Sequence, residues 1–419
     1  MDGADFSRAL NPWSGEQVRF MTAGSVDDGK STLIGRLLLD SQILKRDQTL
    51  AIGAGDEPDL ASLTDGLEAE RAQGITIDVA YRYFATPRTS FIIADAPGHE
   101  QYTRNMVTAA SVSDVAVVVI DATQVVDGVL KAQTRRHAAI ASLMGLDIIV
   151  AVNKMDLTGW SEARFNEVRA AFEVLAIELK ARVAGFLPVS AKVGDNVVSR
   201  GAVDWYAGPT LVELLERTPA RASLAAKALR LPVQVVLRDG NSRHYAGRIE
   251  AGVVRPGDTV RVGASAQAAT VSSVRIGGVA APSAQAGASV SVTLSEQRDL
   301  GPGDVIAAAD VRYTNRIRAD LCWLDQTPWS PARRYRLRQG ALETQAKITN
   351  VSFVRNIETF GQELARELQL NDIAYVDVTA RDPLLADLYA EHPGTGAFVL
   401  FDLDTNQTAA AGMIREIAP

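Results

Sequence analysis

The sequence predicts an α/β domain built on a P-loop, with a mostly parallel sheet and helices on both faces, followed by two small β-barrels. Three observations support this fold class. Residues 24–31 read Gly-Ser-Val-Asp-Asp-Gly-Lys-Ser, the pattern GxxxxGKS, between an apolar stretch at 18–23 and a helical pattern at 32–39. Up to about Ala220, short apolar strands alternate with amphipathic helices. Beyond it, many short β-rich stretches follow one another, as in small barrels.

The predicted strands of the first domain are near-continuous apolar runs, as expected for strands buried on both faces. Between the last two of them, five apolar residues from Phe165 to Leu179 recur at helical spacing and predict a helix with a core-facing stripe. After Pro219 the sequence pattern changes to stretches rich in β-forming residues, separated by turns rich in Gly, Pro and Asp. The predicted strands are 91–94, 115–120, 148–152 and 186–189, then 233–237, 247–254, 259–262, 269–276 and 289–294, then 317–324, 333–337, 344–354, 372–380 and 396–403.

Composition narrows the class of protein. The chain has 419 residues, of which 47% are apolar and 22% charged, which fits a soluble globular protein of two or three domains. Its net charge of −7 provides no bulk attraction to nucleic acid or to an anionic membrane, and we expect neither as a partner. The single cysteine, Cys322, excludes a disulfide framework within the chain. Because no membrane span or apolar signal core is visible, we expect a cytoplasmic protein.

The P-loop pattern predicts a phosphate site. Its two glycines let backbone N–H groups curl around a phosphate chain, and the following helix adds the positive end of its dipole. Lys30 would neutralise the outer phosphates, and the Ser31 hydroxyl is placed to ligate Mg²⁺. The alternative, a glycine turn that happens to end in Lys-Ser, is disfavoured by the strand–loop–helix context. The expected phosphate-binding residues are Gly24, Ser25, Val26, Asp27, Asp28, Gly29, Lys30, Ser31, Thr32 and, from a later segment, Gly98.

Two further segments carry residues suited to sensing a γ-phosphate. Thr76, in a Gly-Ile-Thr-Ile segment, lies where a switch threonine would complete Mg²⁺ coordination, although a strand edge would be the preferred interpretation of this segment without the other motifs. Asp95, in an Asp-Ala-Pro-Gly-His segment, could hold Mg²⁺ through water, and Gly98 could offer its N–H to the γ-phosphate. His99 could orient the attacking water, the alternative being a surface turn histidine. We therefore expect Lys30, Thr76 and His99 to be catalytic.

Two last segments predict guanine as the base. Guanine presents two donors, and the carboxylate of Asp156 in Asn-Lys-Met-Asp can accept both. Asn153 can tie this segment to the P-loop, and the stem of Lys154 can cover the base plane. A turn is the alternative for this segment alone, but five ordered segments at strand ends agree on GTP. The expected guanine site is Asn153, Lys154 and Asp156, with the backbone of Ser190, Ala191 and Lys192 near the guanine carbonyl.

The order of these motifs, followed by two barrels, resembles the translational GTPase superfamily that includes elongation factor Tu. Longer strings resemble a narrower family, the GTPase subunit (subunit 1) of bacterial sulfate adenylyltransferase, over nearly the whole chain. The resemblance implies a GTP-binding domain at 1–222 and β-barrel domains at 230–310 and 313–419. The strings that carry it are 63–67, 70–87, 101–106, 194–198, 332–335, 405–406 and 411–414.

The resemblance also implies a function. The chain would couple GTP hydrolysis, with Mg²⁺, to synthesis of adenylyl sulfate and pyrophosphate from ATP and sulfate. Adenylyl transfer would occur in a smaller catalytic subunit, the partner in a heterodimer or an assembly of heterodimers. The alternative is an elongation-type GTPase that carries aminoacyl-tRNA, with an arginine patch as its RNA contact. The alternation of those arginines with Tyr335 and Leu337 more simply fits the solvated face of a barrel strand. They are Arg333, Arg334, Arg336 and Arg338.

Two departures from the family pattern are visible. Ala96 stands where the family usually has threonine, and the stretch 123–132 is longer than usual before Gln133-Thr134-Arg135-Arg136-His137. Neither is expected to touch a phosphate or base contact, whereas the second could change how a partner is contacted. Some relatives carry a fused adenylyl sulfate kinase. No second GxxxxGK[ST] pattern occurs here, so we expect that activity to be absent from this chain.

Overall fold

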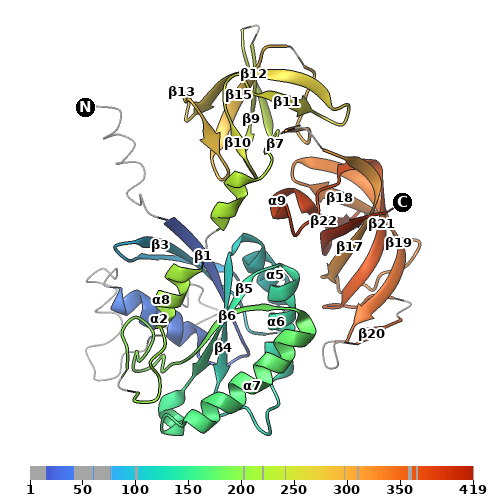
Figure 1. Ribbon diagram of the computed structural model, residues 1–419. Helices are drawn as coiled ribbons and strands as arrows, with labels where there is room; N and C mark the ends of the chain where they lie inside the picture. The colour runs from blue at the N-terminus through green and yellow to red at the C-terminus, as the bar shows by residue number, and fades with distance from the viewer. Residues whose placement is uncertain are drawn as a thin grey trace. The chain divides into compact units, whose positions relative to one another are not determined.

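The computed structural model describes residues 16–41, 60, 76, 78–99, 102–201, 203–218, 221–240, 242–296, 298–308, 311–356, 361–364 and 367–418. They belong to two compact units, one formed by the described residues of 16–218 and the other by those of 221–418 (Figure 1). The string 63–67 lies outside the described residues. So does the first part of the string 70–87, residues 70–77, except for Thr76. No helix of the described segments has both the length and the apolar character needed to cross a bilayer.

The first unit is a six-stranded sheet in the order β2-β3-β1-β4-β5-β6. All neighbouring strands are parallel except β2, which runs antiparallel to β3. Figure 1 shows α2 and α8 on one face of the sheet and α5, α6 and α7 on the other. The elements are β1 (Glu16–Ala23), α2 (Lys30–Asp40), β2 (Ala80–Ala85), β3 (Thr89–Asp95), α5 (Thr103–Val112), β4 (Val115–Asp121), α6 (Ala132–Leu143), β5 (Asp147–Asn153), the 3-10 helix η3 (Met155–Thr158), α7 (Glu162–Leu179), β6 (Arg182–Pro188) and α8 (Leu211–Arg217).

The apolar runs of the sequence form the interior strands of this sheet. Every residue of β4 is buried, as are six of the seven in β5, because helices cover both faces. The predicted helical stripe is confirmed in α7, where Phe165, Val168 and Phe172 are buried. The edge strand β2 was not predicted, because its half-exposed alternation lacks a continuous apolar run. The α/β part of the predicted fold class is therefore confirmed.

The first barrel of the second unit pairs its strands in the order β7-β16-β11-β12-β15-β9-β8. Only Val233 and Gln234 separate β7 from β8. Val233 bonds the backbone of Asp304 beside β16, whereas the N–H of Gln234 bonds Ala246 in β9, so the chain itself closes the ring. The strands are β7 (Arg230–Pro232), β8 (Val235–Asp239), β9 (Ser242–Arg248), β10 (Val253–Val254), β11 (Thr259–Val262), β12 (Gln267–Ile276), β13 (Val279–Ala280), β14 (Ala284–Gln285), β15 (Ser289–Leu294) and β16 (Val305–Ala307), after the 3-10 helix η4 (Arg221–Ala226).

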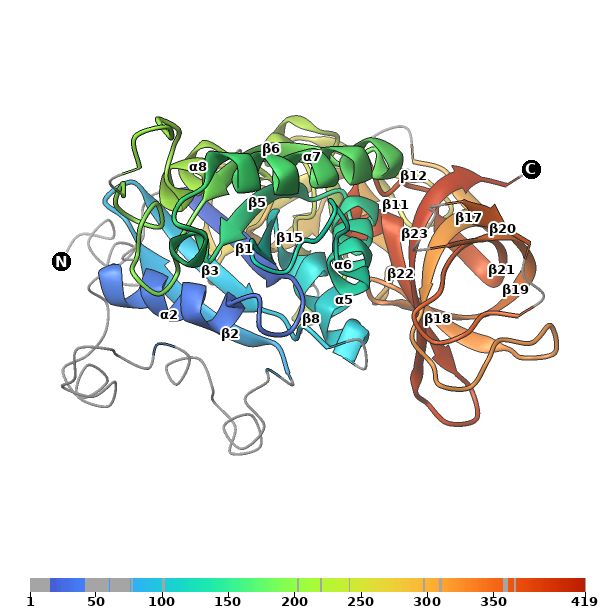
Figure 2. The ribbon, with the colours of Figure 1, turned by 90° about the horizontal axis from the view of Figure 1, so that it is seen from below.

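The second barrel is closed by six strands in the order β18-β22-β23-β17-β21-β19, with a further pairing between β18 and β19. Figure 2 looks into this barrel. Its interior packs Trp323 edge-on against Tyr335, with ring centroids 6.0 Å apart. The elements are β17 (Tyr313–Trp323), β18 (Tyr335–Gln339), β19 (Leu342–Arg355), β20 (Gln362–Glu363), β21 (Ile373–Leu385), α9 (Pro393–Gly396), β22 (Ala397–Asp402) and β23 (Thr408–Ile417).

Several barrel strands differ from the predicted ones. The prediction of one strand at 247–254 is wrong. The strand β9 ends at Arg248, and the chain turns at Gly252, whose φ is +79°. A Cβ at Gly252 would lie 2.5 Å from the Leu229 Cα, so the turn requires glycine. The strands β16 and β23 were not predicted, since β16 has three residues and β23 is rich in alanine. The division into three domains at the stated boundaries stays a prediction.

A buried ion pair joins the two barrels within the second unit. Arg230 at the start of β7 donates from Nε and Nη2 to the Asp387 carboxylate, at 2.8 and 2.9 Å. Both side chains are at most 8% exposed, and Thr395 Oγ1 donates to the same carboxylate at 2.6 Å. Burial by itself would raise the pKa of Asp387, but the hydrogen bonds from Arg230 and Thr395 outweigh it and hold that pKa below its ordinary value of 3.8.

The Asp387→Ala variant should lower the free energy of unfolding of the second unit by about 3–5 kcal/mol at pH 7, because Arg230 is left buried without its partner. The lowered pKa means that this stabilisation is complete above the unfolded value of 3.8 and disappears as the pH falls through the lower folded value. Urea denaturation of both proteins between pH 7 and pH 3 measures the difference. The control is Asp299→Ala, whose exposed carboxylate should leave stability near wild type. An equal loss for both variants would contradict the prediction.

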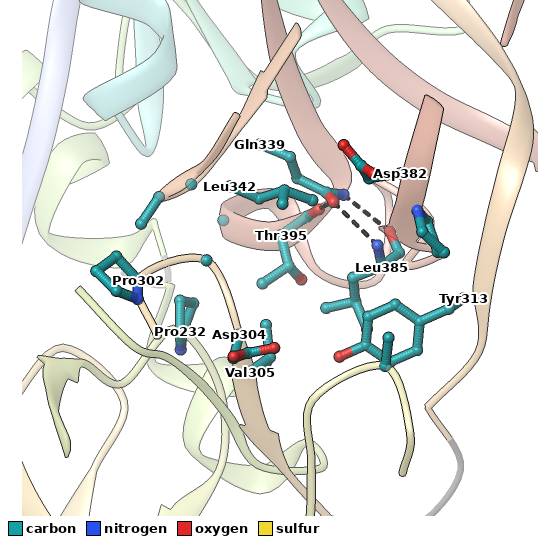
Figure 3. A pocket seen from close by; sticks show the side chains of 16 residues that line it. Pro232, Pro302, Asp304, Val305, Tyr313, Gln339, Leu342, Asp382, Leu385 and Thr395 are labelled. Carbon is teal, nitrogen blue, oxygen red and sulfur yellow. Dashed lines mark hydrogen bonds between the residues drawn. The ribbon is translucent and has the colours of Figure 1, made fainter. Parts of the chain in front are cut away.

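A cavity of about 220 Å³ opens between the two barrels (Figure 3). The Gln339 side chain at its wall donates to the carbonyls of Leu385 and Thr395 at 2.8 and 2.7 Å and accepts from the Leu385 N–H at 3.0 Å. Burial and the nearby carboxylates of Asp304 and Asp387 raise the pKa of Tyr313, another wall residue, to about 12. The phenol is therefore neutral at physiological pH, and the amide of Gln339 is already occupied by backbone partners.

Candidate nucleotide-binding site

The P-loop connects β1 to α2 and needs both of its glycines. Gly24 has φ +140° and Gly29 has φ +91°, conformations that side chains disfavour. A Cβ at Gly24 would lie 2.4 Å from the carbonyl oxygen of Val119 in β4, and a Cβ at Gly29 would lie 2.3 Å from Nδ2 of Asn153. The loop is therefore wedged against the ends of two neighbouring strands, with the N-terminus of α2 directly behind it.

Lys30 occupies the concave side of this loop. Its side chain is 7% exposed, and Nζ donates to the carbonyls of Gly24 at 3.0 Å and Ser25 at 2.6 Å. Burial lowers the pKa of Lys30, while the charges of Asp28 and Asp95 act in the opposite direction. A Cβ on Gly98 would lie 2.5 Å from Lys30 Nζ, so the Asp-Ala-Pro-Gly-His segment passes directly over the ammonium group. The structure thus brings Gly98 and Lys30 together, as the sequence predicted for two groups that bind the same phosphate.

Two of the predicted magnesium ligands are an oxygen at the end of a strand and a hydroxyl in the first turn of α2. Asp95 ends β3 and is 1% exposed, and Thr22 Oγ1 of β1 donates to its Oδ1 at 3.1 Å. Ser31 is the second residue of α2 and is half-buried. A hydroxyl and an oriented carboxylate are the hard oxygen donors that Mg²⁺ prefers, so this donor set fits the ion.

Asn153 ties three loops together. It is 2% exposed at the end of β5, and its Nδ2 donates to the Asp28 carbonyl of the P-loop at 2.9 Å. Its Oδ1 accepts from the N–H of Ala191 at 2.9 Å, in the loop after β6. This one amide therefore holds the predicted phosphate segment and the predicted guanine segment at a fixed spacing.

The other residues of the predicted guanine site lie just after Asn153 or in the loop after β6. Lys154 has φ +60°, and its Nζ lies 2.8 Å from Asp121 Oδ2 at the end of β4, which fixes the direction of its stem. Burial by itself would raise the pKa of Asp121, but the hydrogen bonds from Lys154 and Thr123 outweigh it and lower that pKa. Asp156 is half-buried in η3, and Ser190 is fully buried. Lys192 is exposed, and its carbonyl accepts from Arg36 of α2.

Two predicted catalytic residues are less closely tied to the loop. His99 follows Gly98, is half-buried, and its ring lies edge-on to that of Tyr102 with centroids 6.2 Å apart. Thr76 is half-buried, and within the described residues no hydrogen bond joins it to the P-loop. The structure therefore places His99 directly after Gly98, whereas no hydrogen bond between described residues links Thr76 to the P-loop.

Helix α6 supplies contacts to the P-loop that the sequence did not predict. Lys131 Nζ lies 2.8 Å from Asp28 Oδ1, and Thr134 Oγ1 lies 3.2 Å from Ser25 Oγ. The N–H of Gly24 donates to His137 Nδ1 at 3.0 Å. Burial, with the charges of Lys30 and Arg136, lowers the pKa of His137 to about 3, which keeps this acceptor neutral. The expectation that the long stretch 123–132 stays away from the phosphate loop is wrong, because Lys131 belongs to it.

Comparisons with known proteins identify the family. Residues 16–222 match the family model described as "Elongation factor Tu GTP binding domain", and residues 316–415 match "GTP-eEF1A C-terminal domain-like". The chain is 43% identical to "Sulfate adenylyltransferase subunit 1" of Teredinibacter turnerae over 96% of its length and 88% of that protein's. The chain belongs to the sulfate adenylyltransferase subunit 1 family.

Further similar proteins agree with this result. The protein of that name from Cellvibrio japonicus is 44% identical over 96% of this chain and 87% of its own length. The "Bifunctional enzyme NodQ" of Rhizobium sp. strain N33 is 43% identical over 95% of this chain, which spans only 63% of the NodQ length. The resemblance stated from the sequence strings is confirmed, and so is the fold class of a GTPase domain followed by β-barrels.

Proposed function

We propose that this chain binds and hydrolyses GTP as the GTPase subunit of a sulfate adenylyltransferase. Relatives carry that name, and residues 16–222 match the family model of an elongation factor Tu GTP binding domain. The observation that carries the proposal is the buried amide of Asn153, bonded at 2.9 Å to the P-loop and at 2.9 Å to the Ser190–Ala191 loop. Because one side chain sets the spacing of both loops, the phosphate and base sites have a fixed separation, as one nucleotide needs.

The chemistry of the phosphate site follows from Lys30 and its neighbours. Lys30 would exchange its two backbone carbonyl partners for the β- and γ-phosphate oxygens, which are stronger acceptors because they are charged. The N–H groups of the P-loop and the start of α2 would bind the remaining oxygens, and Gly98 would add its N–H. Ser31, Thr76 and, through water, Asp95 would hold Mg²⁺, which when bound neutralises charge on the phosphate oxygens.

Hydrolysis needs a water in line with the terminal phosphorus. His99 is the residue we assign to orient that water, because it directly follows Gly98, and Gly98 lies against Lys30 Nζ. A neutral imidazole can accept a hydrogen bond from water on one nitrogen while the other donates. Asp156 would accept from both donors of the guanine edge, and Lys154, fixed by Asp121, would cover the ring.

The coupling of GTP to sulfate activation requires a second subunit. The P-loop is assigned in full to the guanine nucleotide, so we assign ATP and sulfate to a smaller catalytic partner, in a heterodimer or an assembly of heterodimers. A partner that binds one nucleotide state more tightly must change GTP affinity by the same factor. The single cysteine, Cys322, fits a reducing compartment, and we expect the cytoplasm.

The barrel arginines give no support to the alternative, an aminoacyl-tRNA carrier. Arg333 is engaged inside its own barrel, with Nη2 3.0 Å from Asp325 and 2.6 Å from Asp402. Arg336 and Arg338 lie on the outward side of β18, whose residues Tyr335 and Leu337 are buried. This is the alternation of an ordinary barrel strand, and the chain's net charge of −7 adds no attraction for RNA.

Reconstitution tests the proposal. Mixed with a separately purified smaller subunit, ATP, radiolabelled sulfate and GTP, the chain should raise the yield of adenylyl sulfate well above that obtained with GDP. GTP turnover should rise when the partner, ATP and sulfate are all present. The chain alone should make no adenylyl sulfate. A yield that ignores GTP, or GTP turnover that responds to charged tRNA and ribosomes instead of the partner, would overturn the proposal.

A further inference from the structure

The P-loop contains a buried carboxylate at a place where phosphates are expected. Asp28 is 1% exposed, and its Oδ2 accepts from the Ser25 N–H at 2.8 Å, so the side chain lies folded back across the loop. A negative charge held inside a site for a polyphosphate repels the ligand, and burial strengthens that repulsion because little water screens it. Some cation must offset it.

Lys131 provides that cation from outside the motif. Its Nζ lies 2.8 Å from Asp28 Oδ1, and it is the residue that precedes α6. Two further side chains from the same face of the helix fix it against the loop, since Thr134 contacts Ser25 and His137 accepts from Gly24. Positions three residues apart lie on one helix face, so α6 presents Lys131 in a fixed direction.

We propose that Lys131 is a positioning residue that sets the affinity of the P-loop for the phosphate chain by neutralising Asp28 and leaving Lys30 free for the ligand. The inference rests on the proposed binding of GTP. Without Lys131, the charge of Asp28 would act on Lys30, the other cation of the described residues whose charge acts on this carboxylate. Lys30 would then be drawn to the carboxylate of its own loop, and the phosphate chain would meet one more negative charge.

The ionisation of Asp28 agrees with this arrangement. Burial raises the pKa of Asp28, whereas the hydrogen bond and charge of Lys131, followed by the charge of Lys30 and the N–H of Ser25, act against it. Among the groups that oppose the effect of burial on this carboxylate, Lys131 acts most strongly. A variant that replaces the carboxylate by an amide keeps an oxygen for the Ser25 N–H and no longer needs the lysine.

The experiment compares dissociation constants for GDP and GTP among the wild type, K131M, K131R, D28N and the double variant D28N/K131M, with K180M as control. Lys180 is an exposed lysine that follows α7. K131M should weaken both affinities by about 10- to 100-fold, the range expected for one uncompensated charge near a phosphate chain. K131R should keep most of the affinity, K180M should equal wild type, and D28N/K131M should match D28N.

Each result has one meaning. An unchanged affinity in K131M, or a loss in K131M that persists between D28N and D28N/K131M, would overturn the inference, because the lysine would then not act through Asp28. If K131M fails to fold, the comparison of D28N with D28N/K131M still decides. Failure of the wild type to bind GTP would instead overturn the proposed function, so the two ideas can be separated.

Discussion

Asp156→Asn should reverse the nucleotide preference of this protein, lowering GTP affinity by about 10²- to 10⁴-fold, since two charge-assisted hydrogen bonds are at stake. The carboxylate would accept from both donors of guanine, N1–H and the exocyclic amine. An amide places a donor opposite one of them, and two facing donors repel. Xanthine carries an oxygen in place of the exocyclic amine, which an amide N–H can satisfy. The variant should therefore bind xanthosine triphosphate more tightly than GTP.

The measurement is a pair of dissociation constants for each protein, with GTP and with xanthosine triphosphate. Asp147→Asn is a matched control, because Asp147 begins β5 and forms an ion pair with Arg182, at the opposite end of the strand from Asn153. The control should keep the preference for GTP. A variant at Asp156 that still prefers GTP would remove this residue from the base site and leave the guanine assignment without its main support.

The parts of the site that could be predicted from the sequence are contiguous in the chain. The P-loop and the Asn-Lys-Met-Asp segment each join a buried strand to the next element, and backbone geometry fixes their side chains locally. Gly24 and Gly29 are an example, because each position leaves no room for a Cβ. The role of Asn153 as a tie to the P-loop could be predicted for the same reason, since parallel strands place their carboxyl ends along one edge.

The parts that could not be predicted depend on how α6 packs. Lys131, Thr134 and His137 are spaced by three, but so are residues on any amphipathic helix, and the sequence does not reveal which face meets the loop. Lys131 lies in the stretch 123–132, where Val126 and Val129 pair across a tight turn with Asp127 and Gly128 at positive φ. The extra length was visible in the sequence, whereas its contact with Asp28 required the fold.

Lys30→Ala should lower the rate of GTP hydrolysis by about 10²- to 10³-fold or more, as for removal of other preorganised groups that stabilise transition-state charge. GTP affinity should fall as well, since Lys30 is the ammonium group held on the concave side of the P-loop and would meet the phosphates in both the ground state and the transition state. Both effects follow from one property, the charge at Nζ. Lys30→Arg should restore little, because Gly98 lies so close to Nζ that a guanidinium has no room.

His99→Ala makes the comparison that separates binding from chemistry. The imidazole would contact only the attacking water, so GTP affinity should stay within about twofold while the single-turnover rate in the reconstituted complex falls about 10- to 10³-fold. Nucleotide affinity and single-turnover rate, measured on the same preparations, distinguish the two variants, and thermal melting without nucleotide checks that each is folded. A normal rate in His99→Ala would exclude this histidine from water positioning. A normal affinity in Lys30→Ala would mean that the P-loop binds the phosphates through its backbone and α2 alone.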